Sequence, residues 1–397
     1  MKIAIIPTGK LPIPAVMGGA VETGIQQLIE QNEIHELLDI TVFSINNNEA
    51  REESKKYNNT RFVFLNNPKI ASNIIRIINK IFRTLGVKFV LNHNYFFNRG
   101  IVKFLKNHKF DHILLKNAIS STLQISKVAG DNLILQLHND FLNSEVYKAE
   151  TIYNKCNKIF VNSNYIKDRV LTIKNSDASK IFVNKNCTDP TVFNRELYLD
   201  YVQEFKNKYN IKNNEVVILF TGRIIPEKGI AELIQAVKKS SNKYKIKLLI
   251  VGSKWFSNNK KSSFEKYLES ICTSIEDQII FTGYVPYQEL PKIHAISDIA
   301  VVPSIWEEPA GRVVIEAEAS GIPVIVTDAG GISDYINPKS SIVVNRDDKF
   351  VDNLSEAINK LIEDKALRTQ MGMDGRKFAC DFSPEHYYNE LIELLKY

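Results

Sequence analysis

Two glutamates with seven residues between them are the side chains of this sequence best placed to do chemistry. Glu308 and Glu316 lie in the segment Val301–Glu316, VVPSIWEEPAGRVVIE. The apolar run that ends at Pro303 predicts a buried strand, and the polar residues after it predict a loop that presents Glu308. The helical pattern that follows places Glu316 about two turns into a helix. Both carboxylates can then face one site, about the length of a ligand apart.

The start of that predicted helix, near Gly311, is suited to binding an anion. The backbone N–H groups of Gly311, Arg312 and Val313 have no partner within a helix, so they would attract a phosphate. Acidic residues near a helix start often do no more than favour the helix dipole. Here the Pro-Ser pair before Glu308 and the run Ala-Ser-Gly-Ile-Pro-Val after Glu316 favour a functional site.

A second candidate segment, Phe220–Gly229 (FTGRIIPEKG), directly follows another apolar run. Arg223 and Lys228 stand on its glycine-bounded loop, which leads into an amphipathic helix. A pyrophosphate needs fixed cations, and Arg offers a bidentate fork while Lys adds a point charge. The alternative is two solvated cations in a loop. The segment is not a Walker loop, because no G-x-x-x-x-G-K-[ST] occurs.

The elements that must position these residues are short apolar, β-branched runs alternating with helical patterns, which is typical of parallel sheets covered by helices. We expect two doubly wound, Rossmann-like α/β domains facing a cleft, with ligands at the carboxyl ends of the strands. The domains are predicted over 1–195 and 215–380, joined through the polar segment Phe193–Asn214, with a C-terminal helix at 381–397 that can return to the first domain. The strands are expected at Lys2–Pro7, Asp39–Ile45, Arg61–Leu65, Asp111–Leu115, Asn132–Leu137, Lys158–Asn162, Lys180–Asn184, Val216–Thr221, Ile246–Val251, Gln278–Thr282, Asp298–Val302, Ile322–Thr327 and Ser340–Val344.

Composition is that of a globular protein, with 44% hydrophobic and 24% charged residues. No run approaches the ~20 apolar residues of a membrane span, and the first residues lack the features of a signal peptide. The four scattered cysteines predict reduced thiols and a cytoplasmic location. Charge is uneven: residues 1–195 hold 26 Lys and Arg against 16 Asp and Glu, and residues 196–397 hold 25 against 29. The first half is therefore expected to meet something anionic.

The motifs together resemble glycosyltransferase family 4, whose members have the GT-B fold and retain anomeric configuration. The resemblance rests on the order Gly-Arg…Glu-Lys-Gly, Pro-Ser…Glu-x7-Glu and Ala-Ser-Gly-Ile-Pro-Val, and it is strongest over residues 216–336. The opening KLPIPAVMGGA and the later LHND are similar to its spore-coat and surface-polysaccharide subset. Two departures are Ala310, where the family often has an aromatic residue, and Asn186-Cys187 in place of the usual Asn-Gly.

The resemblance implies roles for the charged residues. Glu308 would contact hydroxyls of the donor sugar near the reacting carbon, and Glu316 would hold the ribose hydroxyls. Arg223 and Lys228 would grip the diphosphate.

It implies roles for uncharged positions and one histidine as well. Gly18 and Gly19 match a loop whose backbone approaches the donor phosphate, and His138 matches a residue close to the transferred sugar. Tyr284 and Val285 belong to a turn whose backbone contacts the base. A lone histidine at a strand end is more often structural, which is the alternative for His138.

The resemblance further implies a nucleotide-sugar donor, UDP before GDP, and a glycan or lipid-linked acceptor. No D-x-D occurs, so no metal site is indicated, and no cofactor or nucleic acid partner is expected. A nucleotide-sugar epimerase and a non-catalytic sugar-binding protein share the fold and remain alternatives. A nicotinamide dehydrogenase is disfavoured because no G-x-G-x-x-G follows a strand.

Residues 55–109 predict contact with an anionic membrane surface. This segment holds twelve basic residues and no acidic one, namely Lys55, Lys56, Arg61, Lys69, Arg76, Lys80, Arg83, Lys88, Arg99, Lys103, Lys106 and Lys109. Ile70, Ile74, Ile77, Ile78, Ile81 and Leu85 follow helical spacing, with Arg76, Lys80 and Arg83 on another face, as in a helix lying in a lipid interface. The alternative is a helix whose apolar face packs on the first sheet and whose basic face is solvated.

Overall fold

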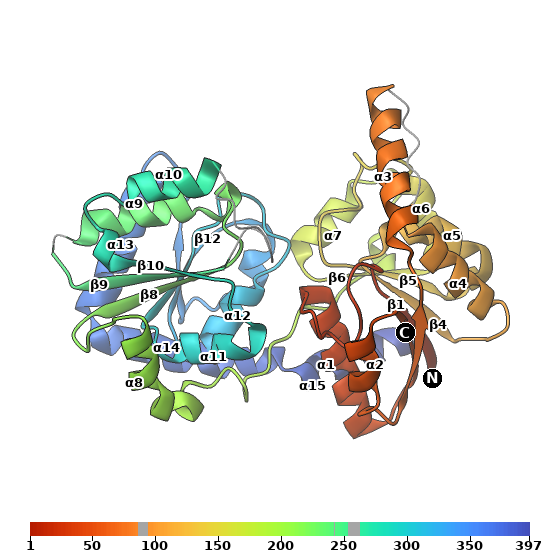
Figure 1. Ribbon diagram of the computed structural model, residues 1–397, viewed down its shortest axis with the longest axis horizontal. Coiled ribbons are helices and arrows are strands. Elements are labelled where there is room, and N and C mark those ends of the chain that lie inside the picture. The colour runs from red at the N-terminus through yellow and green to blue at the C-terminus, as the bar shows by residue number, and fades with distance from the viewer. Residues whose placement is uncertain (86–93, 242, 253–262) are drawn as a thin grey trace. The chain divides into compact units, whose positions relative to one another are not determined.

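The computed structural model describes residues 1–85, 94–241, 243–252 and 263–397; the side chains of residues 69–72, 76 and 83 are outside the description. Part of the membrane prediction therefore lies outside the described residues, namely Lys88 and the side chains of Lys69, Ile70, Arg76 and Arg83. Two compact units are formed (Figure 1). Unit 1 comprises residues 1–186 and 384–397, and unit 2 comprises residues 187–383.

Unit 1 is built on a sheet of seven parallel strands in the order β3-β2-β1-β4-β5-β6-β7. The strands are β1 (Lys2–Ile6), β2 (Asp39–Ile45), β3 (Thr60–Leu65), β4 (His112–Lys116), β5 (Leu133–Leu137), β6 (Lys158–Val161) and β7 (Ile181–Val183). The helices are α1 (Ala20–His35), α2 (Asn48–Ser54), α3 (Lys69–Thr84), α4 (Tyr95–Leu105), α5 (Ile119–Ala129), α6 (Ala149–Lys155), α7 (Asn164–Leu171) and α15 (Pro384–Lys396).

The C-terminal helix α15 packs on unit 1, although residues 187–383 separate it from the rest of that unit. Leu115 of β4 belongs to the core that α4–α7 cover. Successive strand residues point to opposite faces, so Lys116 points to the other face, where its buried Nζ donates to Tyr387 Oη of α15 at 2.6 Å. Tyr388 Oη donates to Asn32 Oδ1 of α1 at 2.7 Å. Helix α15 thus completes the second face of this sheet together with α1.

Unit 2 is built on six parallel strands in the order β10-β9-β8-β11-β12-β13. The strands are β8 (Val216–Thr221), β9 (Ile246–Val251), β10 (Ile279–Gly283), β11 (Ile299–Val302), β12 (Val324–Thr327) and β13 (Ser341–Val344). The helices are α8 (Leu199–Lys208), α9 (Ile230–Ser241), α10 (Ser263–Ile271), α11 (Leu290–Ala295), α12 (Arg312–Ala319), α13 (Phe350–Glu363) and α14 (Lys365–Ala379). Helices α9, α10 and α13 share a core with one face of this sheet, and α8 and α11 share one with the other (Figure 1).

All thirteen predicted strands are present, each within two residues of its expected ends. Strands covered on both faces are continuous apolar runs, which makes them conspicuous in the sequence. The polar segment Phe193–Asn214, where we expected the junction between the domains, contains helix α8. Its Phe193, Phe205 and Ile211 are buried in the core of unit 2.

None of the helices in the described part of the chain is both long enough and apolar enough to cross a bilayer.

Candidate functional site

The predicted site residues of unit 2 follow strands at the centre of its sheet. Arg223 and Lys228 come after β8, and Glu308 comes after β11. These strands are neighbours at the point where the strand order reverses direction. In open α/β sheets, ligands bind outside the carboxyl ends of the strands at such a switch point.

Lys228 and Glu308 form the closest charged contact of this site. Lys228 Nζ donates to Glu308 Oε1 at 2.5 Å, and Ser304 Oγ donates to the same oxygen at 2.5 Å. The side chain of Glu308 is buried, and that of Lys228 is one-fifth exposed. Among the described residues, none is hydrogen-bonded to Glu308 Oε2. The pair therefore holds one carboxylate oxygen and leaves the other oxygen for a ligand.

Close backbone approaches bring the loops after β8 and β11 together. Gly229 has φ +67°, and a Cβ built on it would lie 1.8 Å from the carbonyl oxygen of Pro303. Ile305 N donates to Glu227 O across the same contact at 3.0 Å. Only glycine permits both the positive φ and this contact, so Gly229 sets the position of Lys228 beside Glu308.

The backbone of Glu308 is held from the other side by the loop after β12. Gly331 N donates to Glu308 O at 2.7 Å, and a Cβ on Gly330, where φ is +55°, would lie 2.5 Å from that oxygen. Thr327 Oγ1 donates to Ser304 O at 2.7 Å. Glu308 is thus fixed through its backbone as well as through its side chain.

The buried Glu316 forms a polar cluster with Arg312 and Tyr287, which are partly buried. Arg312 Nε donates to Glu316 Oε1 at 3.1 Å, and Arg312 Nη2 donates to Tyr287 Oη at 2.9 Å. Burial raises the pKa of Glu316, while the neighbouring guanidinium acts in the opposite direction. Burial, followed by the nearby charge of Glu316, raises the pKa of Tyr287 to about 12. The guanidinium of Arg312 is therefore directed to Glu316 and Tyr287.

Helix α12 begins where the anion site was expected. Gly311 is its N-cap residue, and a Cβ there would lie 2.8 Å from Cβ of Tyr335, which is fully buried. The N–H groups of Arg312 and Val313 belong to the first turn, whose donors have no acceptor within the helix. The side chain of Arg312 is bonded to Glu316 and Tyr287, so α12 presents backbone N–H groups, and not this guanidinium, to an anion.

The remaining predicted residues of unit 2 lie at the same edge of its sheet. Arg223 is exposed, and no ion pair joins it to another described residue. Tyr284 and Val285 follow β10; Tyr284 is half exposed and Val285 is partly buried. The roles assigned to all these residues stay predictions.

In unit 1, Gly18 and Gly19 are the last two residues of the loop between β1 and α1. Their φ values are +72° and +105°, a conformation that favours glycine. A Cβ on Gly19 would lie 2.4 Å from Glu22 Oε2. Glu22 is buried, and this burial raises the pKa of its carboxyl group. The loop therefore packs closely on a carboxyl group that the sequence did not single out.

His138 directly follows β5 and is held by three asparagines. Its Nδ1 lies 3.2 Å from Asn186 Oδ1, and its backbone N–H donates to Asn117 Oδ1 at 3.3 Å. Asn162 Nδ2 donates to His138 O at 3.3 Å. The ring is positioned at the carboxyl edge of the sheet, as expected for a strand-end residue, and its role stays a prediction.

Sequence reasoning missed Ser304, Tyr287 and Gly330 as contributors to the site. Ser304 lies in the Pro-Ser pair already singled out, so its proximity to Glu308 was available as a signal. Tyr287 reaches Arg312 only through the fold, because 25 positions separate them. Gly330 follows β12, and its pairing with Gly331 was the only local indication of a close approach.

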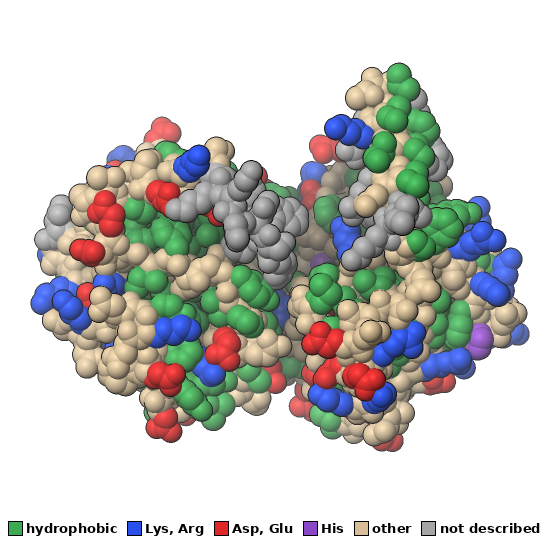
Figure 2. All heavy atoms as spheres, in the orientation of Figure 1, with side chains coloured by type: hydrophobic (Ala, Val, Ile, Leu, Met, Phe, Trp, Pro, Cys, Tyr) green, Lys and Arg blue, Asp and Glu red, His purple; other side chains and the backbone are tan. Residues whose placement is uncertain are grey.

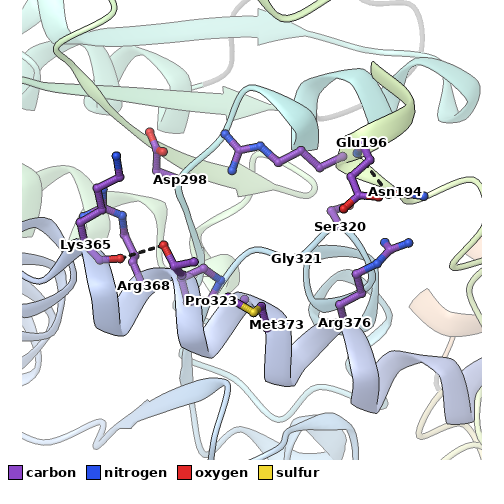
Figure 3. Close-up of a pocket in the computed structure, with 13 residues that line it drawn as sticks. Asn194, Glu196, Asp298, Ser320, Gly321, Pro323, Lys365, Arg368, Met373 and Arg376 are labelled. Carbon is purple, nitrogen blue, oxygen red and sulfur yellow. Dashed lines mark hydrogen bonds between the residues drawn. The ribbon is translucent and has the colours of Figure 1, made fainter. Parts of the chain in front are cut away.

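A cavity of about 400 Å³ lies at the other edge of the unit 2 sheet (Figure 3). Asp298 and Pro323, which line it, precede β11 and β12, and Lys365, Arg368 and Arg376 reach it from α14. None of the predicted site residues lines this cavity.

The chain is similar to known proteins in sequence and in fold. The family model described as Glycosyl transferases group 1 matches residues 202–378. The putative glycosyltransferase YtcC and the spore coat protein SA of Bacillus subtilis (strain 168) are each 25% identical to the chain over 387 residues, covering 95% and 96% of this chain and 87% and 94% of those proteins. The capsular polysaccharide biosynthesis glycosyltransferase CapM of Staphylococcus aureus is 30% identical over 278 residues, which are 68% of this chain and 69% of that protein.

Solved structures show the same fold. Anabaena HepE in complex with UDP superimposes with a TM-score of 0.75 at 17% identity, covering 100% of both chains. A glycosyltransferase from Rickettsia africae superimposes with a TM-score of 0.73 at 20% identity, covering 100% of this chain and 97% of that one. With two parallel-sheet α/β domains of the GT-B fold, the chain belongs to the group 1 glycosyl transferases.

Proposed function

We propose that this glycosyltransferase is a member of family 4 that retains anomeric configuration. The donor is a UDP-sugar carrying a hexose or N-acetylhexosamine, and the acceptor is a glycan or a lipid-linked glycan of cell-surface polysaccharide synthesis. The enzyme acts in the cytoplasm, at the inner face of the cell membrane. Residues 1–195 take the acceptor side, and residues 215–380 bind the nucleotide sugar.

The observation that carries this proposal is the Lys228–Glu308–Ser304 contact at the switch point of unit 2. A cation and a carboxylate lie in contact there. The cation suits the anionic diphosphate of a nucleotide sugar, and the carboxylate suits the hydroxyl donors of its sugar. Arg223 stands exposed on the same loop as Lys228 and supplies a second cation.

The chemistry follows from where charge develops. The bond between the anomeric carbon and the diphosphate breaks, so negative charge grows on the leaving phosphate. Fixed positive groups lower the activation barrier for breaking this bond, because they need no reorganisation during the reaction. Lys228, Arg223 and the first N–H groups of α12 supply them.

The sugar and the acceptor complete the assignment. Glu308 accepts hydrogen bonds from sugar hydroxyls through Oε2, Glu316 holds the ribose, and His138 lies near the transferred sugar. Gly18 and Gly19 let backbone approach the donor phosphate, and Tyr284 and Val285 contact the base. The acceptor hydroxyl attacks the face that the nucleotide leaves, and a donor phosphate oxygen takes its proton, so configuration is retained.

The names of similar proteins support the donor and the pathway. HepE binds UDP in its crystal, and CapM is described as acting in capsular polysaccharide biosynthesis.

A panel of UDP- and GDP-sugars tested for thermal stabilisation identifies the donor, because a ligand of the folded state raises the unfolding temperature. Arg223→Ala should then weaken UDP binding about 10- to 150-fold, since a charge-assisted hydrogen bond contributes about 1.5–3 kcal/mol. Arg195→Ala is the matched control, because Arg195 lines the cavity at the other edge of the sheet. Equal UDP affinity in both variants and the parent protein would place the diphosphate elsewhere.

The reaction itself is tested with labelled donor and the anomeric configuration of the product by NMR. Glu308→Gln should bind UDP and lower turnover by orders of magnitude. Conversion of the nucleotide sugar without an acceptor would indicate an epimerase. Tight binding of a donor without any turnover would indicate a sugar-binding protein.

A further inference from the structure

Helix α3 of unit 1 carries an apolar face that no other part of the described structure buries. Ile74, Ile77 and Ile81 follow one another at intervals of three and four residues, so they share one side of the helix. Leu85, directly after the helix, continues this spacing, and its backbone N–H donates to Ile81 O at 3.0 Å. The exposed fractions of these four side chains, in chain order, are 52%, 61%, 50% and 71%. The alternative in which the apolar face packs on the first sheet does not hold for these four side chains, which we call the α3 stripe. Hydrophobic side chains can be seen gathered along this helix in Figure 2.

The α3 stripe belongs to the carboxyl edge of the unit 1 sheet. Helix α3 follows β3, just as the Gly18 loop follows β1 and His138 follows β5. Figure 1 shows α3 extending from this unit beyond its other helices. The Gly18 loop, His138 and the α3 stripe therefore follow strands at the same edge of the sheet.

Further exposed apolar side chains accompany the stripe at this edge. Tyr95 and Phe96 open α4 and are 47% and 43% exposed. Asn94 directly before them donates to Thr8 O, just past β1, which fixes the start of α4 at the carboxyl edge. Met17, Phe141 and Tyr147 on the loops after β1 and β5 are more than half exposed as well.

The charge of the residues around this surface indicates which partner covers it. Between Glu53 and Asp111 the chain has twelve basic residues and no acidic one. Of these, Lys80 on α3 and Arg99 and Lys103 on α4 are described and exposed. A second copy of this chain would bring two such basic segments together, at an electrostatic cost. A surface of anionic lipid offers apolar volume beneath negative head groups, which complements both properties.

We propose that α3 is a membrane-insertion helix. Its stripe enters the boundary between head groups and acyl chains, Tyr95 and Phe96 lie at the head-group level, and the basic side chains contact anionic lipid. Insertion brings the carboxyl edge of the unit 1 sheet, with Gly18 and His138, to the bilayer. This edge then receives an acceptor whose lipid carrier stays in the membrane. The insertion stands without the proposed function, whereas the presentation of a lipid-linked acceptor rests on it.

The test is sedimentation of the full chain with vesicles of phosphatidylcholine, with and without phosphatidylglycerol. The double variant Ile77→Gln/Ile81→Gln should bind anionic vesicles about 100-fold more weakly, because burying each isoleucine contributes roughly a factor of ten. Ile34→Gln/Leu37→Gln is the matched control. Both of these side chains are at least half exposed on unit 1, but they lie among Glu30, Glu33 and Glu36, so binding should not change.

The charge component is tested with Lys80→Glu/Arg99→Glu/Lys103→Glu, which should abolish the preference for phosphatidylglycerol and the loss of binding in high salt. Sedimentation of the Ile77/Ile81 variant equal to the parent protein would overturn the proposal, as would equal binding to neutral and anionic vesicles. Dimers in lipid-free solution that the same variant dissociates would assign the stripe to a second copy instead. UDP affinity of the variants, measured in parallel, should match the parent protein, so a failure of insertion is separable from a failure of the proposed function.

Discussion

The substitution Lys228→Met removes the ammonium group that donates to Glu308 and keeps a side chain of similar length. Glu308 is only 6% exposed, and Ser304 Oγ is then the one described donor left to its carboxylate. The variant therefore tests whether unit 2 depends on this ion pair to tolerate a buried negative charge.

The size of the effect follows from burial. Removing one partner of a fully buried ion pair costs about 3–5 kcal/mol, because the other charge is left without compensation. The side chain of Lys228 is 20% exposed and that of Glu308 is 8% exposed, so water reaches part of the pair. We expect Lys228→Met to lower the free energy of unfolding of unit 2 by about 2–3 kcal/mol. Glu308→Gln should cost less, about 1 kcal/mol, since the neutral amide still accepts from Ser304 and Lys228 can turn to water.

The unfolding of unit 2 can be followed separately from that of unit 1. Both tryptophans of the chain, Trp255 and Trp306, lie within residues 187–383, so tryptophan fluorescence in urea reports on this unit. Free energies of unfolding come from the fluorescence transition at pH 7. UDP affinity of the same samples is measured by calorimetry.

The double variant Lys228→Met/Glu308→Gln is decisive, because it removes both charges. We expect it to recover at least half of the stability lost in Lys228→Met, while UDP affinity stays below that of the parent protein, since the diphosphate still lacks the ammonium group of Lys228. If the double variant is as unstable as the sum of the single variants, the two charges are not coupled and the reasoning is wrong. If UDP affinity returns to that of the parent protein, Lys228 serves stability alone.

Two further predictions concern unit 2. Burial raises the pKa of Glu318 to about 7 from 4.5, so its contribution to stability is fully present below pH 4.5 and is lost as the pH rises to about 7. A pKa shift of one unit corresponds to about 1.4 kcal/mol, so the free energy of unfolding of Glu318→Gln should rise by about 3 kcal/mol relative to that of the parent protein between pH 4.5 and pH 7.5, as measured by urea titrations. If the difference between the two proteins does not change with pH, Glu318 does not titrate in this range. Gly229→Ala should destabilise unit 2 by more than about 3 kcal/mol, because its Cβ meets backbone of Pro303, whereas Gly283→Ala, with φ +71° and open space around it, should cost only about 1–2 kcal/mol. Equal costs in the same urea assay would mean that the contact with Pro303 relaxes freely.

The fold was largely predictable because buried parallel strands are apolar runs with polar boundaries. The strand expected at Ile322–Thr327 begins two residues later, at Val324, after Pro323, which has no N–H to donate to a ladder. The polar composition of Phe193–Asn214 concealed a helix, because a few buried residues such as Phe205 are enough to anchor α8.

The site was predictable in its residue types but less so in its contacts. Lys228 and Glu308 are 80 positions apart, and their meeting depends on β8 and β11 being neighbours and on the contact of Gly229 with Pro303. The pattern of α3 predicted which side is apolar. It could not say whether anything covers that side, because amphipathicity is a property of the helix alone.

The discontinuity of unit 1 has a consequence for the order of folding. Unit 2 is one continuous stretch, and all of it is synthesised before α15. Unit 1 starts earlier but must wait for α15, because Tyr387 is the partner of the buried Lys116 and Asn184 Nδ2 donates to Glu390 at 2.7 Å. The N-terminal unit therefore cannot complete its fold before all of unit 2 has been synthesised, whereas domains usually complete their folds in their order along a nascent chain. Until then, the face of its sheet that α15 covers is exposed to chaperones and proteases.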